Sequence, residues 1–84
     1  MYEVYLERAA ERDLKKLAKV VIPRVISTIE SLARNPRPAG CRKITGSKSN
    51  WRIRVGDYRI VYEIIETSKT VRIMYIRHRR DAYR

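Results

Sequence analysis

The sequence has little of what disulfide-linked and metal-dependent proteins need. It contains one cysteine and one histidine, which excludes an internal disulfide and a zinc site built from these side chains. Its C-terminal half holds four scattered carboxylates, Asp57, Glu63, Glu66 and Asp81, so a two-metal nuclease site would lack ligands. We therefore expect neither a metal nor a cofactor.

The chain is also short and has no long apolar run. Its 84 residues leave room for one domain, residues 1–84, and are too few for cofactor enzymes of the Rossmann or barrel type. No uncharged apolar stretch, such as Val20 to Pro23, is longer than four residues, so neither a signal peptide nor a membrane span is expected. We expect a reduced, cytoplasmic protein with no membrane partner.

Negative charge is scarce, whereas positive charge is abundant. The chain has 20 Lys and Arg residues against 9 Asp and Glu residues, which gives a net charge of +11. Most of the excess lies in residues 41–84, where twelve basic and four acidic side chains leave a net +8. A surplus of this size predicts a polyanionic partner, and nucleic acid is the first candidate.

The N-terminal half predicts one strand and two helices. Residues 2–6 alternate apolar and charged side chains, as a short strand does. Apolar residues then recur every three or four positions over residues 7–21 and again over residues 22–33, which is typical of amphipathic helices. Pro36 and Pro38 end the second helix, because proline cannot continue the hydrogen-bond ladder.

A hairpin in the C-terminal half gives the strongest local signal. Residues 51–55 and 58–65 have strand-like patterns on either side of a Gly-Asp pair, a two-residue turn that fixes the register. In this register Arg54 faces Arg59 and shares its side with Arg52. The opposite side is apolar and is expected to pack against the helices; it consists of Trp51, Ile53, Val55, Tyr58, Ile60, Tyr62 and Ile64.

A third strand is expected over residues 70–76, with Val71, Ile73 and Tyr75 on the apolar side. A brief extended piece is expected over residues 42–44. The predicted fold is therefore α+β, with two N-terminal helices packed on a small twisted antiparallel sheet in the order β-α-α-β-β-β.

The arginine cluster predicts a phosphate-binding site. Arg52, Arg54 and Arg59 lie within reach of one another, and such like charges destabilise a sheet unless something offsets them. A bound phosphate does so, because its oxygens match the planar guanidinium fork. A solvated basic surface is the simpler alternative. The same side of the third strand is expected to lead to His78, and the tail adds more candidates: Arg79, Arg80 and Tyr83.

Cleavage of RNA needs no metal if the neighbouring 2′-hydroxyl is the nucleophile. The protein then has to remove the hydroxyl proton, hold the phosphate and neutralise the charge that develops. Arginines serve the last two purposes. Surrounding cations lower the pKa of a phenol, which makes Tyr83 a candidate general base, and His78 is the competing candidate.

Four segments of the chain, in succession, resemble a known protein family. Residues 9–17, 26–36, 51–62 (WRIRVGDYRIVY) and 78–83 (HRRDAY) are similar to the RelE side of the RelE/ParE toxin superfamily, and the resemblance covers nearly the whole chain. The last two segments are its most specific parts. It implies a bacterial toxin of a type II toxin–antitoxin system, with two helices on a four-stranded antiparallel sheet. It also implies cleavage of mRNA in the ribosomal A site, beside ribosomal RNA, and silencing by a cognate antitoxin.

The resemblance further implies roles for single residues. Arg59 and Arg79 match the family's phosphate-stabilising arginines, and Tyr83 matches its proposed general base. Arg52 and Arg54 stand where better-known members have lysines, which keeps the charge but removes a proton donor, a part that His78 could take. The catalytic candidates are thus Arg59, Arg79, Tyr83 and His78, and the RNA-binding candidates are Arg52, Arg54, Lys43, Lys48, Arg77 and Arg80.

Two other functions stay open. Relatives on the ParE side share the fold but inhibit DNA gyrase and lack this set of residues, so the presence of Arg59, Arg79 and Tyr83 favours RNA cleavage. The chain could also be a nucleic-acid-binding module without activity, since basic surfaces bind nucleic acids without cutting them.

Overall fold

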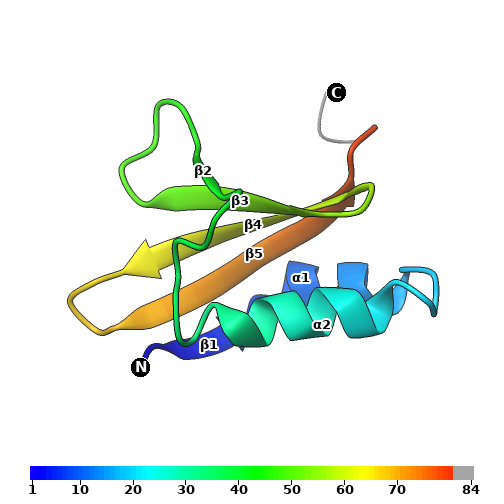
Figure 1. Ribbon diagram of the computed structural model, residues 1–84, viewed down its shortest axis with the longest axis horizontal. Helices are drawn as coiled ribbons and strands as arrows, with labels where there is room; N and C mark the ends of the chain where they lie inside the picture. Colours follow the sequence, from blue (N-terminus) through cyan, green and yellow to red (C-terminus); the bar gives the residue numbers. More distant parts are fainter. Residues whose placement is uncertain (81–84) are drawn as a thin grey trace.

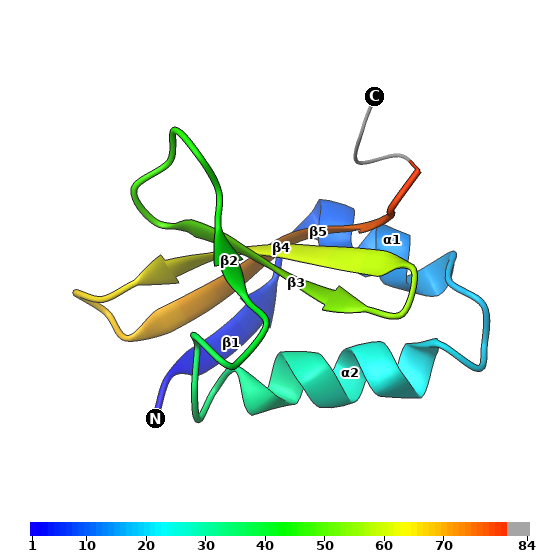
Figure 2. The same ribbon diagram turned by 45° about the horizontal axis from the view of Figure 1, so that its top comes forward.

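The computed structural model describes residues 1–80 as two helices and five strands. In chain order these are β1 (Glu3–Leu6), α1 (Arg8–Lys15), α2 (Ile22–Ser31), β2 (Arg42–Lys43), β3 (Asn50–Val55), β4 (Tyr58–Ile65) and β5 (Thr70–His78). The strands form one sheet in the order β1-β5-β4-β3-β2, and the helices lie on one side of it (Figure 1). On the other side, the β2–β3 loop and the segment that follows β5 rise above the sheet (Figure 2).

The α+β class and the predicted order of elements are confirmed, but the sheet is mixed rather than wholly antiparallel. β1 runs parallel to β5, with Val4 beside Val71 and Leu6 beside Ile73. The two helices carry the chain across the sheet before β2 starts at the far edge, so β1 is left at the other edge beside the last strand. The brief extended piece expected over residues 42–44 is the short strand β2.

The first helix is shorter than its apolar pattern predicts, because it ends at Lys15. The backbone N–H of Lys16 bonds the carbonyl of Asp13 at 3.1 Å, and that of Leu17 bonds the carbonyl of Leu14 at 3.3 Å. These bonds reach three residues back instead of four, which tightens the last turn. The chain can then reverse into α2, although the apolar spacing continues through the reversal.

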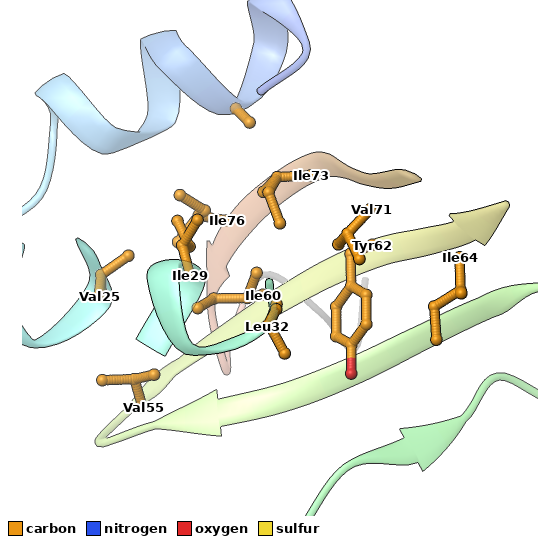
Figure 3. Close-up of a cluster of buried hydrophobic side chains, with 11 residues drawn as sticks. Val25, Ile29, Leu32, Val55, Ile60, Tyr62, Ile64, Val71, Ile73 and Ile76 are labelled. Carbon is orange, nitrogen blue, oxygen red and sulfur yellow. The ribbon is translucent and has the colours of Figure 1, made fainter. Parts of the chain in front are cut away.

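The hydrophobic core lies between the two helices and the sheet (Figure 3). Tyr62 is fully buried there and donates its hydroxyl to the carbonyl of Pro36 at 2.7 Å, which ties the proline segment to β4. Burial raises the pKa of the Tyr62 hydroxyl. The buried cluster consists of Ala10, Val25, Ile29, Leu32, Val55, Ile60, Tyr62, Ile64, Val71, Ile73 and Ile76.

An irregularity in β5 changes which of its residues face the core. Val61 pairs with Tyr75, but the next residue of β4 pairs with Ile73, so Met74 is an extra residue in β5. A bulge of this kind exchanges the two sides of the strand beyond it. Ile76 therefore enters the core, and the prediction that Tyr75 lies there was wrong. That prediction follows from regular alternation of side chains through Met74.

Glu66, in the turn between β4 and β5, holds three parts of the chain together. It accepts a hydrogen bond from the Tyr2 hydroxyl at 2.6 Å and forms ion pairs with Arg37 at 2.9 Å and Lys69 at 3.3 Å. The Tyr2 hydrogen bond, followed by those of Arg37 and Lys69, lowers the pKa of Glu66 from 4.5 to about 2. The charged carboxylate thus stabilises the fold above its ordinary pKa, and this stabilisation is lost as the pH falls through about 2.

Glu66→Gln should lower the midpoint of thermal unfolding at pH 7 by roughly a few degrees, because glutamine cannot keep the charged contacts. The deficit should shrink between about pH 5 and pH 2, where the wild-type carboxylate is protonated in the unfolded chain before the folded one. Circular dichroism melts across this range measure both effects. Glu30→Gln is the matched control, since Glu30 is exposed and forms no ion pair within residues 1–80. A deficit that does not change with pH would contradict the role assigned to Glu66.

Candidate nucleic-acid interface

The β3–β4 hairpin brings the predicted arginines together. Gly56 adopts a φ of +59°, as the first residue of a tight hairpin turn often must. Arg54 lies opposite Arg59 in the observed register, and Arg52 shares their side because side chains two residues apart on a strand do so. The predicted register of this hairpin is confirmed.

The bulge in β5 places Arg77 on the same side of the sheet, where it extends the pair Arg54 and Arg59 into a row across three strands. Arg77 lies opposite Arg59, so Arg54, Arg59 and Arg77 sit on three neighbouring strands that are about 4.8 Å apart. Strand β2 contributes another, because Arg42 lies opposite Arg52. We call this set the arginine face: Arg42, Arg52, Arg54, Arg59 and Arg77.

The arginine face has a buried centre and a more exposed rim. Arg59 is 7% exposed, whereas Arg42 and Arg54 are exposed. With Arg52 and Gly40, the two exposed arginines line a hollow of about 270 Å³. Within residues 1–80, these three lining arginines form no ion pair. The hollow therefore concentrates positive charge, and such an environment favours a phosphate group.

Arg77 is partly engaged by other groups. Its guanidinium carbon lies 4.7 Å from the centre of the Tyr75 ring, and its Nε lies 3.5 Å from an oxygen of Asp13. Because the Arg77 side chain is 47% exposed, this ion pair is weak. Arg77 can therefore still interact with an anion on the arginine face.

Acidic residues limit the arginine face toward the far end of the sheet. Arg72 lies opposite Glu63 and is ion-paired with it, and it also pairs with Glu7 at 2.8 Å. Glu63 accepts a further hydrogen bond from Ser49 at 3.1 Å. Since these groups neutralise one another, the surplus positive charge lies toward the β3–β4 turn.

His78 does not join the arginine face. The bulge places it opposite Tyr58, on the helix side, where the two rings meet edge to face with their centroids 5.3 Å apart. Its Nδ1 accepts a hydrogen bond from the backbone N–H of Arg80 at 3.2 Å, so the neutral ring carries its proton on Nε2. The prediction that His78 lies beside the arginines was wrong, again because it follows from a regular strand.

The other tail candidates follow β5 directly. The backbone N–H of Arg79 donates to the carbonyl of Asp57 at 2.7 Å, which holds this segment against the hairpin turn. The side chains of Arg79 and Arg80 are exposed. Tyr83 lies outside the described residues.

The two lysine candidates occupy different places in the structure. Lys43 pairs with Trp51 and so faces the helix side, while Lys48 is exposed in the β2–β3 loop. Arg42, which the sequence pattern does not single out, takes the place beside Arg52. Its signal in the sequence is weak, because a strand of two residues is too short to show alternation.

The arrangement can bind phosphate and stabilise negative charge, but arginine neither gives nor takes a proton at working pH. Proton transfer would require other groups. The described part of the chain contains no group of three or more His, Cys, Asp or Glu side chains that could hold a metal ion. None of its helices is long and apolar enough to cross a membrane.

Comparison with known sequences identifies relatives along almost the full length of the chain. The profile of a family described as the ParE toxin of the type II toxin–antitoxin system parDE matches residues 4–83. Toxin RelG of Mycobacterium tuberculosis is 34% identical over 99% of this chain and 97% of its own.

Solved structures share the fold as well. The toxin–antitoxin complex RelBE2 from Mycobacterium tuberculosis contains a chain that is 28% identical, with a TM-score of 0.81 over 92% of this chain and 96% of that one. The archaeal RelE–RelB complex from Pyrococcus horikoshii contains a chain that is 25% identical, with a TM-score of 0.83 over 93% and 94%. Sequence and fold therefore agree that this chain belongs to the RelE/ParE superfamily of toxins of type II toxin–antitoxin systems.

Proposed function

We propose that this toxin is a single-domain cytoplasmic endoribonuclease that cleaves mRNA in the ribosomal A site and is silenced by a cognate antitoxin. The observation that carries the proposal is the row of Arg54, Arg59 and Arg77 across three adjacent strands. A phosphate on this row would meet several guanidinium groups at once, whereas a solvated basic surface would gain nothing from holding like charges so close.

In the proposed reaction, the 2′-hydroxyl of one nucleotide attacks the phosphorus that follows it. The new bond closes a 2′,3′-cyclic phosphate on the upstream fragment, and the broken bond releases the 5′-oxygen of the downstream fragment. Negative charge grows on the phosphate oxygens during this step. Arg59, in the buried centre of the arginine face, is best placed to stabilise that charge, because electrostatic interactions strengthen away from water.

Two protons must also move. We assign removal of the 2′-hydroxyl proton to Tyr83, on the basis of the family resemblance. His78 is a poorer candidate, because its ring lies on the helix side of the sheet beside Tyr58. The leaving oxygen takes its proton from water, since the arginines that replace the family's lysines hold their protons too tightly.

The solved structures support an antitoxin partner, because the similar chains in them belong to toxin–antitoxin complexes. A net charge of +11 favours a partner segment that supplies carboxylates. Such a segment on the arginine face would compete directly with RNA.

Inhibition of DNA gyrase is the second candidate function. It is favoured by one observation, namely that the matching family profile carries the ParE description. The relatives named RelG and RelBE2 favour the ribonuclease instead.

Arg59→Ala should slow single-turnover cleavage of mRNA on ribosomes by about 10²-fold or more, as loss of one transition-state donor does. Arg59→Lys should recover only part of the rate, because lysine keeps the charge but not the fork. Arg34→Ala, at an exposed residue without an ion pair in the described chain, is the control. Melting curves must show that each variant is folded. If the Arg59→Ala variant is folded and cleaves at the wild-type rate, the arginine face has no part in the mechanism.

A 2′-deoxy substitution at the cut site should abolish cleavage but leave binding nearly intact, because it deletes the nucleophile and keeps the phosphate. Cleavage of normal RNA should persist in EDTA once the ribosome's own requirement for magnesium is controlled for, since arginines supply the charge stabilisation. Mass spectrometry should find a 2′,3′-cyclic phosphate on the upstream product. Cleavage of the deoxy substrate would contradict the mechanism.

Tyr83→Phe should reduce the cleavage rate by about 10²- to 10⁴-fold, because phenylalanine keeps the ring but cannot accept the proton. His78→Ala is the comparison. If only the histidine variant is slow, Tyr83 is not the base.

If gyrase activity falls in expressing cells while transcripts stay intact, gyrase inhibition replaces RNA cleavage as the function.

A further inference from the structure

A groove on the helix side of the sheet contains, beside Arg77, cationic and aromatic groups to which the proposed cleavage assigns no role. It lies between α1 and the end of β5 and has a volume of about 590 Å³, within the roughly 300–1,000 Å³ of typical small-molecule sites. We call it the α1–β5 groove. The residues that matter for its chemistry are Arg12, Lys16, Leu17, Tyr58, Ile76 and His78.

The groove exists because β5 extends past the end of β1. Beyond Ile73, no strand within residues 1–80 lies beside the edge of β5 on the α1 side, and α1 approaches this edge instead. Asp13 on α1 accepts the backbone N–H of Ile76 at 2.9 Å and is also 3.5 Å from Nε of Arg77. The Asp13 carboxylate thus fixes the helix to the strand and is already hydrogen-bonded.

The rim of the α1–β5 groove is positively charged. Arg12 lies in α1 and Lys16 follows the last residue of this helix, and both line the groove. Both are exposed, and neither forms an ion pair within residues 1–80. Among residues 1–80, Asp13 is the one acidic residue in the lining, and its contacts with Ile76 and Arg77 do not extend to the two rim cations.

The interior of the groove is aromatic and apolar. Tyr58 and His78 meet edge to face at 87°, and Leu17 and Ile76 add apolar surface. The hydrogen bond from the Arg80 backbone to Nδ1 fixes the orientation of the His78 ring. Rings inside a cationic rim are the combination that binds single-stranded nucleic acids, where bases stack and phosphates pair with cations.

We propose that the α1–β5 groove holds one unpaired RNA nucleotide, with its base against Tyr58 and His78 and its phosphate beside Arg12 and Lys16. The proposal rests on the proposed function, because it takes RNA as the substrate. Arg77 and His78 are consecutive on β5 and face opposite sides of the sheet, so RNA that leaves the arginine face over the end of β5 arrives at the groove. The nucleotide comes either from the mRNA or from ribosomal RNA. An acidic peptide would use the cations but would leave the ring pair without a partner.

Photo-crosslinking tests the occupant directly. An unstructured oligoribonucleotide that contains 5-iodouridine is irradiated with the full-length toxin, and the attached peptides are mapped by mass spectrometry. We expect attachment at Tyr58 or His78. The same experiment on ribosomes, with 5-iodouridine in the mRNA only, separates the sources: attachment of mRNA assigns the nucleotide to the message, and loss of attachment there assigns it to ribosomal RNA. Absence of crosslinks at both residues with the free oligoribonucleotide would overturn the proposal.

Charge reversal tests the rim. Arg12→Glu combined with Lys16→Glu should weaken oligoribonucleotide binding by about tenfold or more, and should flatten the plot of log affinity against log salt by about 0.7 for each phosphate that the rim no longer neutralises. Arg8→Glu combined with Lys15→Glu is the matched control. It makes the same change in net charge on the same helix, at exposed residues outside the groove. Equal effects of the two pairs would reduce the groove to general electrostatic attraction and overturn the proposal.

Different results would contradict the groove proposal and the proposed RNA cleavage. If the wild-type toxin cuts mRNA but never crosslinks through the groove, the groove proposal is wrong and the ribonuclease stands. If it crosslinks through the groove but cuts nothing, the groove binds RNA and the proposed cleavage is wrong. If the groove variants lose binding to the purified antitoxin but keep their affinity for RNA, the occupant is a protein segment and the nucleotide assignment falls.

Discussion

The pairing of β4 with β5 governs both sides of this sheet. Because Met74 is accommodated as an extra residue, Ile76 reaches the core and Arg77 reaches the arginine face. Regular alternation through residue 78 would instead expose Ile76 and direct Arg77 toward the core, where an unpaired charge costs several kcal/mol or more. Burial of the apolar Ile76 and exposure of the charged Arg77 therefore both favour the bulge. The apolar core and the basic surface are consequences of a single register choice.

Charge is sorted along the open side of the sheet rather than spread over it. At one end, Glu63 and Glu7 neutralise Arg72. Toward the β3–β4 turn, arginines stand beside arginines on adjacent strands. Guanidinium groups stay charged at any working pH, so the repulsion among them is permanent, and a bound anion relieves it. A polyanion that occupies this surface should accordingly stabilise the folded chain by mass action.

The sequence predicts most of the fold because its signals there are local. The Gly-Asp turn and the alternation around it determine the β3–β4 register, and hence the position of Arg54 opposite Arg59. The misplaced residues depend on non-local choices. Tyr75 and His78 change sides because of a bulge that only packing selects, and β1 runs parallel because its partner lies at the other end of the chain. The place of Arg42 could not be predicted, because its strand has two residues.

The short outer strands of the sheet have a consequence for how the protein behaves in solution. An open strand edge is a template on which other chains can add strands and aggregate. Here the outermost strands, β1 and β2, have only four and two residues, and Asp13 occupies the N–H of Ile76 where β5 would otherwise lie open. With a net charge of +11 on every copy, mutual repulsion acts in the same direction. The chain therefore resists self-association through edge pairing.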